Sequence, residues 1–154
     1  MKGKFFGSTA PKNQMIMTRR EAREAIFALL FESEFRKDES AEEIYYSSVE
    51  NREIEEDDFI KRAYFGIAEK REAIDAKIGE HAKGWKTQRL TNVSRSVLRL
   101  GVYEMLYEDT IPYSVSINEA VEIAKKYDEE KARPFINGVL NSVKNDLEST
   151  GKTK

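Results

Sequence analysis

The sequence predicts an all-α protein, a compact bundle of about seven helices in two sub-bundles that join near residues 82–93. Apolar residues recur at helical spacing along most of the chain, and no segment shows the apolar–polar alternation of a strand. Three prolines and eight glycines leave long stretches rich in good helix formers. With 154 residues, the chain is long enough to bury a substantial core.

The first half of the chain carries three predicted helices. The first spans residues 18–36 with Thr18 as its N-cap, and a short acidic helix follows over 40–50. A long helix is predicted over 57–81, because apolar residues keep helical spacing throughout it. Trp85 interrupts the pattern, and we expect it to plug the core.

Three more helices are predicted in the second half. The helix over 94–108 is apolar nearly all round, so we expect it in the middle of a bundle. Pro112 disfavours helix at the preceding residue and ends this segment. The remaining helices span 115–127 and 130–148, where Pro134 is tolerated in the first turn.

The two ends of the chain lack helical periodicity. Residues 1–17 are expected to form a flexible leader, which is either an upstream start choice or a non-native remnant, since Met17 is itself a plausible start. Residues 18–148 are predicted as a single helical domain. Residues 149–154 are predicted as a disordered tail.

Composition excludes several classes of site. The chain has no cysteine, so disulfides and thiolate metal sites are ruled out, and one histidine, His81, cannot assemble a zinc cluster. We therefore expect no metal and no cofactor. No apolar run approaches the ~20 residues needed to cross a bilayer, and none has the pattern of a signal peptide. The predicted location is cytoplasmic, with no membrane partner.

No catalytic motif is present in the sequence. It contains no glycine-rich phosphate loop, no Gly-x-Ser-x-Gly and no histidine–cysteine pair. Acidic pairs such as Glu42 and Glu43 lie in a highly charged run, whereas a catalytic pair needs burial to separate the two pKa values. The sequence therefore predicts that the protein is not an enzyme.

Charge is unevenly distributed, although the net charge is only −2. Residues 1–20 and 81–103 carry basic residues and no acid, whereas residues 32–58 hold twelve acids against three bases. One interpretation is a field with two poles that would attract a polyanion to the basic part. The other is that these runs only decorate solvated helix faces.

An arginine and phenylalanine stripe follows the first predicted helix. Arg20, Arg23, Phe27 and Phe31 share one side of it at helical spacing. The rings are either buried against a second layer of helices or form a platform where arginines hold phosphates beside an aromatic edge. The sequence leaves both interpretations open.

Five short motifs stand in a fixed order along the chain: RREARE at 19–24, VLRL at 97–100, IPY at 111–113, INEA at 117–120 and FINGVL at 135–140. Together they resemble the NusB family of bacterial transcription antitermination factors. The resemblance spans roughly residues 18–147.

The resemblance implies an all-helical fold and a role in RNA synthesis. NusB-like proteins bind the single-stranded boxA element of ribosomal RNA leaders, as a heterodimer with the small-subunit ribosomal protein NusE. The heterodimer loads onto elongating RNA polymerase and suppresses premature termination. Some relatives form homodimers, so a homodimer is a further expected assembly. Residues 18–148 would then be an RNA-binding domain.

Site residues are carried over from the family by position. The resemblance implies RNA contacts through the following residues: Arg19, Arg20, Arg23, Phe31, Arg133 and Phe135. Phe31 replaces a frequent tyrosine, and Lys131 and Arg133 stand where some relatives have an aspartate and a histidine. The NusE-binding face would lie around the helix over 94–108 and the turn after it, with these residues: Arg95, Arg99, Ile111, Pro112 and Tyr113.

Two alternatives remain at this point. The protein is either a helical protein–protein adaptor whose arginines are solvated decoration, or an RNA-binding domain related to ribosomal RNA cytosine methyltransferases. The second alternative would require a cofactor-binding domain, and the sequence has no Rossmann-type glycine motif.

Overall fold

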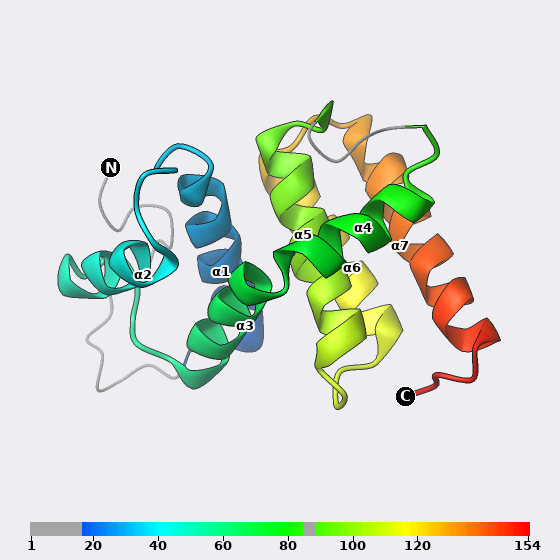
Figure 1. Ribbon diagram of the computed structural model, residues 1–154, viewed down its shortest axis with the longest axis horizontal. Coiled ribbons are helices and arrows are strands. Elements are labelled where there is room, and N and C mark those ends of the chain that lie inside the picture. The colour runs from blue at the N-terminus through cyan, green and yellow to red at the C-terminus, as the bar shows by residue number, and fades with distance from the viewer. Residues whose placement is uncertain (1–16, 85–88) are drawn as a thin grey trace. The chain divides into compact units, whose positions relative to one another are not determined.

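The computed structural model describes residues 17–84 and 89–154, which form seven α-helices and no strand. The helices are α1 (Arg19–Ser33), α2 (Ala41–Glu50), α3 (Asp58–Glu69), α4 (Arg71–His81), α5 (Asn92–Tyr107), α6 (Tyr113–Tyr127) and α7 (Ala132–Ser149). The predicted all-α class is confirmed (Figure 1). Most of the predicted leader and Trp85 lie outside the described residues. Among those described, no helix has both the length and the apolar character to span a membrane.

The chain divides into two compact units between Ala68 and Glu69. The junction predicted near 82–93 is therefore wrong, and the helix predicted over 57–81 is in fact two helices, α3 and α4. They are separated at Lys70, whose backbone (φ −103°, ψ 23°) departs from helical geometry. Periodicity shows that a helix face is buried but not what covers it. One apolar stripe therefore concealed a change from one unit to the other.

The first unit contains α1, α2 and α3, and its first two helices begin at capping boxes. Thr18 Oγ1 accepts a hydrogen bond from the Glu21 backbone N–H at 3.0 Å, and Glu21 Oε1 accepts one from the Thr18 N–H at 2.9 Å. Ser40 and Glu43 repeat the arrangement at the start of α2. These reciprocal bonds satisfy N–H groups that a helix end otherwise leaves unpaired, so they fix where both helices begin.

Aromatic rings fill much of the interior of the first unit. Phe27, Tyr45 and Tyr64 are almost completely buried, and the Tyr45 and Tyr64 rings stack with centroids 6.4 Å apart. The Tyr64 hydroxyl lies 2.9 Å from Ser33 Oγ, so this hydrogen bond ties α3 to the end of α1. Large buried rings hold these short helices in place, and the Tyr64 hydroxyl adds a hydrogen bond between two of them.

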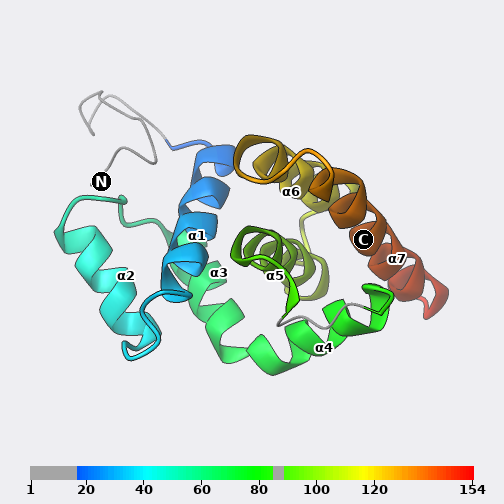
Figure 2. The same ribbon diagram turned by 90° about the horizontal axis from the view of Figure 1, so that it is seen from above.

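The second unit is built around α5, which lies among α4, α6 and α7 (Figure 2). Every residue of α5 from Ser94 to Met105 is buried, as its nearly all-round apolar character predicts. Gly101 permits a close approach to the neighbouring helices. A Cβ atom at Gly101 would lie 3.1 Å from Leu140 Cδ1 on α7 and 3.6 Å from Ala120 Cβ on α6.

Several buried polar side chains in the second unit are hydrogen-bonded, although Ser96 Oγ on α5 has no partner among the described residues. Ser116 Oγ on α6 donates to the buried Glu104 carboxylate at 2.7 Å, and the Tyr103 hydroxyl donates to Glu108 at 2.8 Å. Lys154, in the segment predicted as a disordered tail, places its Nζ within 3.0 Å of three backbone carbonyl oxygens near the C-terminal end of α5 (Glu104, Glu108 and Ile111). Its ammonium thus adds a charged donor to carbonyls at the end of α5, two of which also accept backbone hydrogen bonds.

The close packing at Gly101 gives a stability prediction. Gly101→Val should destabilise the protein by about 1–3 kcal/mol, because the added methyl groups would overpack the α5 contact with Leu140. The matched control is Gly79→Ala on α4, where an added Cβ has no neighbour within 4 Å. This change should be neutral or stabilise by up to about 1 kcal/mol through helix propensity. Urea unfolding followed by circular dichroism measures both, and equal stabilities would contradict the packing argument.

Candidate nucleic-acid interface

The stripe predicted on α1 changes from buried to exposed along the helix. Phe27 is buried, Phe31 is half-buried with its ring centroid 6.0 Å from that of Phe27, and Phe35 follows at 5.2 Å from Phe31. Phe35 lies just beyond the helix and is 65% exposed. The burial predicted for the stripe therefore holds for Phe27, while its use as an RNA-binding platform stays a prediction. Phe27 belongs to the core, and Phe31 leads from it to a surface ring that sequence reasoning missed.

The N-terminal part of α1 directs arginines at one aromatic ring. The guanidinium carbon of Arg19 lies 4.0 Å from the centroid of the Phe59 ring on α3, and that of Arg23 lies 6.0 Å from it. Arg62, one turn along α3, approaches the same ring at 5.5 Å. The electron-rich face of an aromatic ring attracts cations, so the ring holds all three guanidinium groups near it.

These arginines differ in their access to solvent. Arg19 and Arg62 are exposed, as is Arg20, whereas Arg23 is buried. Guanidinium groups bind phosphate oxygens through paired hydrogen bonds. The first unit thus presents a cluster suited to a phosphate backbone. Arg62 was missed because its sequence position gives no sign that α3 lies beside α1.

Arg133 and Phe135, the other predicted RNA contacts, lie in the first turn of α7 in the second unit. Both are half-buried. Arg133 Nη2 is 3.2 Å from a Glu130 carboxylate oxygen, and Lys131 Nζ is 3.7 Å from one of Glu129. The positive charge expected beside Phe135 is therefore balanced locally. Exposed ion pairs contribute little stability, so RNA phosphates are able to compete with these glutamates.

Two residues predicted to bind the partner protein are engaged inside the second unit. Arg99 is buried and donates two hydrogen bonds, from Nε and Nη2, to the two carboxylate oxygens of Asp75 on α4, each 2.8 Å long. Arg95, also buried, donates to the Leu90 carbonyl oxygen at 2.7 Å and to the Asn92 side chain. A partner would have to break these bonds to reach either guanidinium group.

The turn before α6 holds the other predicted partner residues. Ile111 and Tyr113 are buried, and Pro112 is exposed as the N-cap of α6. The Tyr113 hydroxyl donates to the Lys152 carbonyl oxygen at 2.9 Å, and burial raises the pKa of this tyrosine. Burial also lowers the pKa of Lys154, whose Nζ lies 4.7 Å from the centroid of the Tyr113 ring. Pro112 is thus the member of this turn that is open to direct contact.

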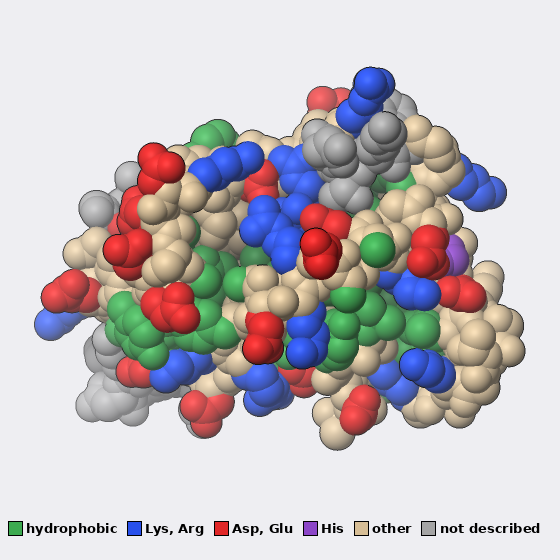
Figure 3. Space-filling view, viewed as in Figure 1, with side chains coloured by type: hydrophobic (Ala, Val, Ile, Leu, Met, Phe, Trp, Pro, Cys, Tyr) green, Lys and Arg blue, Asp and Glu red, His purple; other side chains and the backbone are tan. Residues whose placement is uncertain are grey.

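An exposed tyrosine and exposed acidic residues lie on α2 in the first unit. Tyr46 of α2 is 45% exposed, packs edge-on against Tyr45, and has Lys61 Nζ 5.5 Å from its ring centroid. The pKa of Lys61 is raised by its hydrogen bond with Tyr46. Hydrophobic and acidic side chains gather over α2 and α3 in this view (Figure 3). The acidic run over 32–58 extends to Asp57 and Asp58, which directly precede Phe59 in the chain.

The chain is similar to proteins named as transcription antitermination proteins. The sequence profile of the NusB family matches residues 20–145. The transcription antitermination protein NusB of Bacillus pumilus is 43% identical over 131 residues, which cover 85% of this chain and 98% of that protein. The resemblance seen in the five motifs is confirmed. Relatives with this name are not enzymes, in agreement with the prediction.

Solved structures agree with the sequence comparison. NusB of T. maritima has a TM-score of 0.75 at 40% identity and covers 84% of this chain and 92% of its own. A crystal structure of the antitermination factors NusB and NusE in complex with dsRNA has a TM-score of 0.71 at 31% identity, covering 82% and 97%. The predicted NusB-like fold is therefore confirmed.

The paired hydrogen bonds between Arg99 and Asp75 give a second stability prediction. Arg99→Lys should destabilise the protein by about 1–3 kcal/mol, because an ammonium group cannot make two parallel bonds to one carboxylate. Arg89→Lys is the matched control, since Arg89 is exposed and its replacement should change stability by no more than about 0.5 kcal/mol. Thermal unfolding of both variants measures the difference. A loss equal to that of the control would show that Arg99 is free for other partners.

Proposed function

The chain belongs to the NusB family, and we propose that it is a transcription antitermination factor that binds single-stranded boxA-type RNA of ribosomal RNA leaders. It does so together with the ribosomal protein NusE, in the cytoplasm, as part of the complex on elongating RNA polymerase. The observation that carries the proposal is the convergence of Arg19, Arg23 and Arg62 on the Phe59 ring. A cluster of this kind is suited to binding successive phosphates.

Each unit contributes a different part of RNA recognition. The exposed arginines of the first unit, Arg19, Arg20 and Arg62, hold the backbone, and this contact carries little sequence information. Phe135 and Arg133 at the start of α7 offer an aromatic ring for a base and a charge for its phosphate. Phe31 and Phe35 add aromatic edges on α1. Single-stranded RNA is suited to such a surface because its bases are free to stack on aromatic rings.

Partner binding completes the proposal. A solved relative is in complex with both NusE and dsRNA, which supports a surface for each on this chain. We place NusE at the exposed Pro112 and the turn around it, with Arg95 and Arg99 supporting α5 from within. A homodimer that competes with NusE is a further expected assembly.

The alternatives predict different behaviour. A pure adaptor would bind NusE without preferring any RNA. A methyltransferase-related RNA-binding domain is disfavoured, because the Bacillus pumilus relative is matched over 98% of its length, so the likeness is to whole NusB proteins.

The proposed function predicts sequence-preferring, salt-dependent RNA binding. Fluorescence anisotropy with a single-stranded boxA-like RNA should show tighter binding than a scrambled single strand or the same RNA as a duplex, and NusE should tighten it further. About 3–5 phosphate contacts give a log–log salt slope near −2 to −3.5. Equal affinity for all three RNAs in the presence of NusE would contradict the proposal and favour the adaptor.

The two surfaces should respond differently to mutation. Arg62→Gln and Arg19→Gln should each reduce the magnitude of the salt slope by about 0.7 and weaken boxA and scrambled RNA alike. Arg52→Gln is the control, an exposed arginine in the turn after α2.

Phe135→Ala should weaken RNA binding by about 1–3 kcal/mol through lost stacking while the salt slope stays constant, and Phe135→Tyr should restore the affinity. Arg62→Gln behaving like the control would remove Arg62 from the interface.

A further inference from the structure

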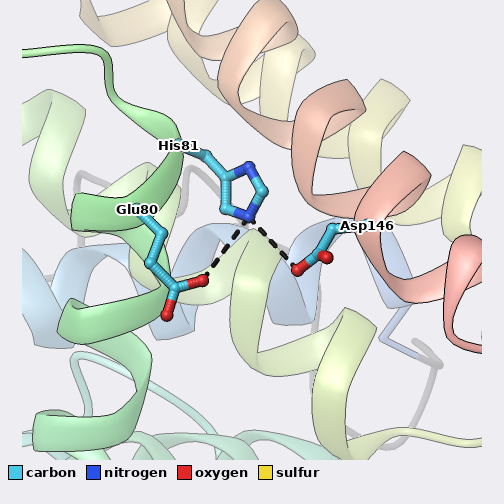
Figure 4. Close-up of side chains that lie close together, drawn as sticks. All are labelled: Glu80, His81 and Asp146. Atoms are coloured by element: carbon cyan, nitrogen blue, oxygen red, sulfur yellow. Dashed lines mark ion pairs between the residues drawn. The ribbon is translucent and has the colours of Figure 1, made fainter.

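Three side chains that each carry a potential metal ligand lie close together between α4 and α7 in the second unit. Glu80 and His81 end α4, and Asp146 lies on α7. Figure 4 shows the two carboxylates directed at the same imidazole nitrogen. His81 Nε2 is 3.4 Å from Asp146 Oδ2 and 3.8 Å from Glu80 Oε1. One ligand atom from each of the three residues lies within 4.8 Å of those from the other two.

The histidine ring is held in a defined orientation. His81 Nδ1 is 2.7 Å from Ser142 Oγ on α7, a hydrogen bond that fixes the ring and directs Nε2 at the carboxylates. Nε2 itself is buried and makes no hydrogen bond to any residue that the structure describes. A ring nitrogen oriented by a hydrogen bond on the other ring nitrogen is the usual arrangement of a metal-binding histidine.

The separations fit a metal better than direct hydrogen bonds. Hydrogen bonds between nitrogen and oxygen are about 2.7–3.2 Å long, shorter than either Nε2 distance. Tetrahedral zinc with ligands at about 2.0–2.1 Å has ligand atoms about 3.3 Å apart. The Nε2–Oδ2 distance already matches this edge, and the exposed Glu80 side chain is able to swing inward. We propose that Glu80, His81 and Asp146 form a binding site for a divalent cation of the zinc class.

Lys77 would compete with a metal ion for the two carboxylates. Its Nζ lies 3.0 Å from Asp146 Oδ2 and 3.5 Å from Glu80 Oε1, the same two oxygens that would bind the metal. Without a metal, the ammonium group balances the carboxylates. With a metal, Lys77 swings away into solvent, a water molecule completes the coordination, and the ion joins α4 to α7. Sequence reasoning excluded a metal site because it considered histidine clusters and had no means of bringing Asp146 to His81.

The composition of the chain limits the number of side chains that could bind zinc. His81 is the only histidine and there is no cysteine, so any zinc bound through nitrogen must bind here. Titration of the untagged full chain with Zn²⁺ by calorimetry should give one saturable equivalent. The melting temperature should rise with Zn²⁺, since the ion binds only the folded arrangement. Co²⁺ should give the absorption of a tetrahedral complex. In NMR spectra, the Nε2 resonance of the single histidine should shift on metal binding while Nδ1 stays protonated.

Variants distinguish Zn²⁺ binding at this site from non-specific Zn²⁺ binding by surface carboxylates. His81→Gln and Asp146→Asn should each abolish the saturable equivalent, and Ser142→Ala should weaken it about tenfold or more through loss of ring orientation. Lys77→Met should tighten binding, because it removes the competing ammonium group. Asp109→Asn, an exposed acid of the turn after α5, is the control and should change nothing. Absence of saturable binding in both the parent chain and Lys77→Met, or binding that survives His81→Gln, would overturn the proposal.

Discussion

The second unit depends on the burial of α5 on all sides. A helix that is covered all round needs partners for the charged side chains it buries and space where other helices approach it closely. Arg99 is paired with Asp75, Glu104 is paired with Ser116, and Gly101 leaves room for Leu140. The two polar pairs satisfy charged groups whose burial would otherwise be costly. The positions of α4, α6 and α7 around α5 follow from these requirements.

The first unit uses an aromatic ring in a comparable way. Phe59 is buried at the start of α3, and its ring is the meeting point of arginines from two helices. Cation–π attraction offsets part of the repulsion between the guanidinium groups and leaves two of them facing solvent. The same contacts thus stabilise the packing of α1 on α3 and create the positive surface on which the proposed function rests.

Two arginines from the sequence motifs illustrate how tertiary structure assigns roles. Arg19 and Arg99 both belong to stretches that resemble NusB, and each was a candidate for binding. Arg19 is exposed over a ring, whereas Arg99 is buried with both carboxylate oxygens of Asp75 as acceptors. Nothing near Arg99 in the sequence reveals Asp75, because the two residues lie on different helices. The motifs identified the family, but contacts decided which residues remain available.

The sequence by itself determined the helical class, the family, the N-cap of the first helix and the central position of α5. These properties follow from local propensity, from side-chain hydrogen bonds within one turn and from the period of apolar residues. Only the tertiary structure decided that one apolar stripe divides at Lys70, that Arg62 joins Arg19 at Phe59, and that Asp146 reaches His81. The physical reason is that periodicity reports burial of a face, while the identity of its neighbours depends on how distant helices pack.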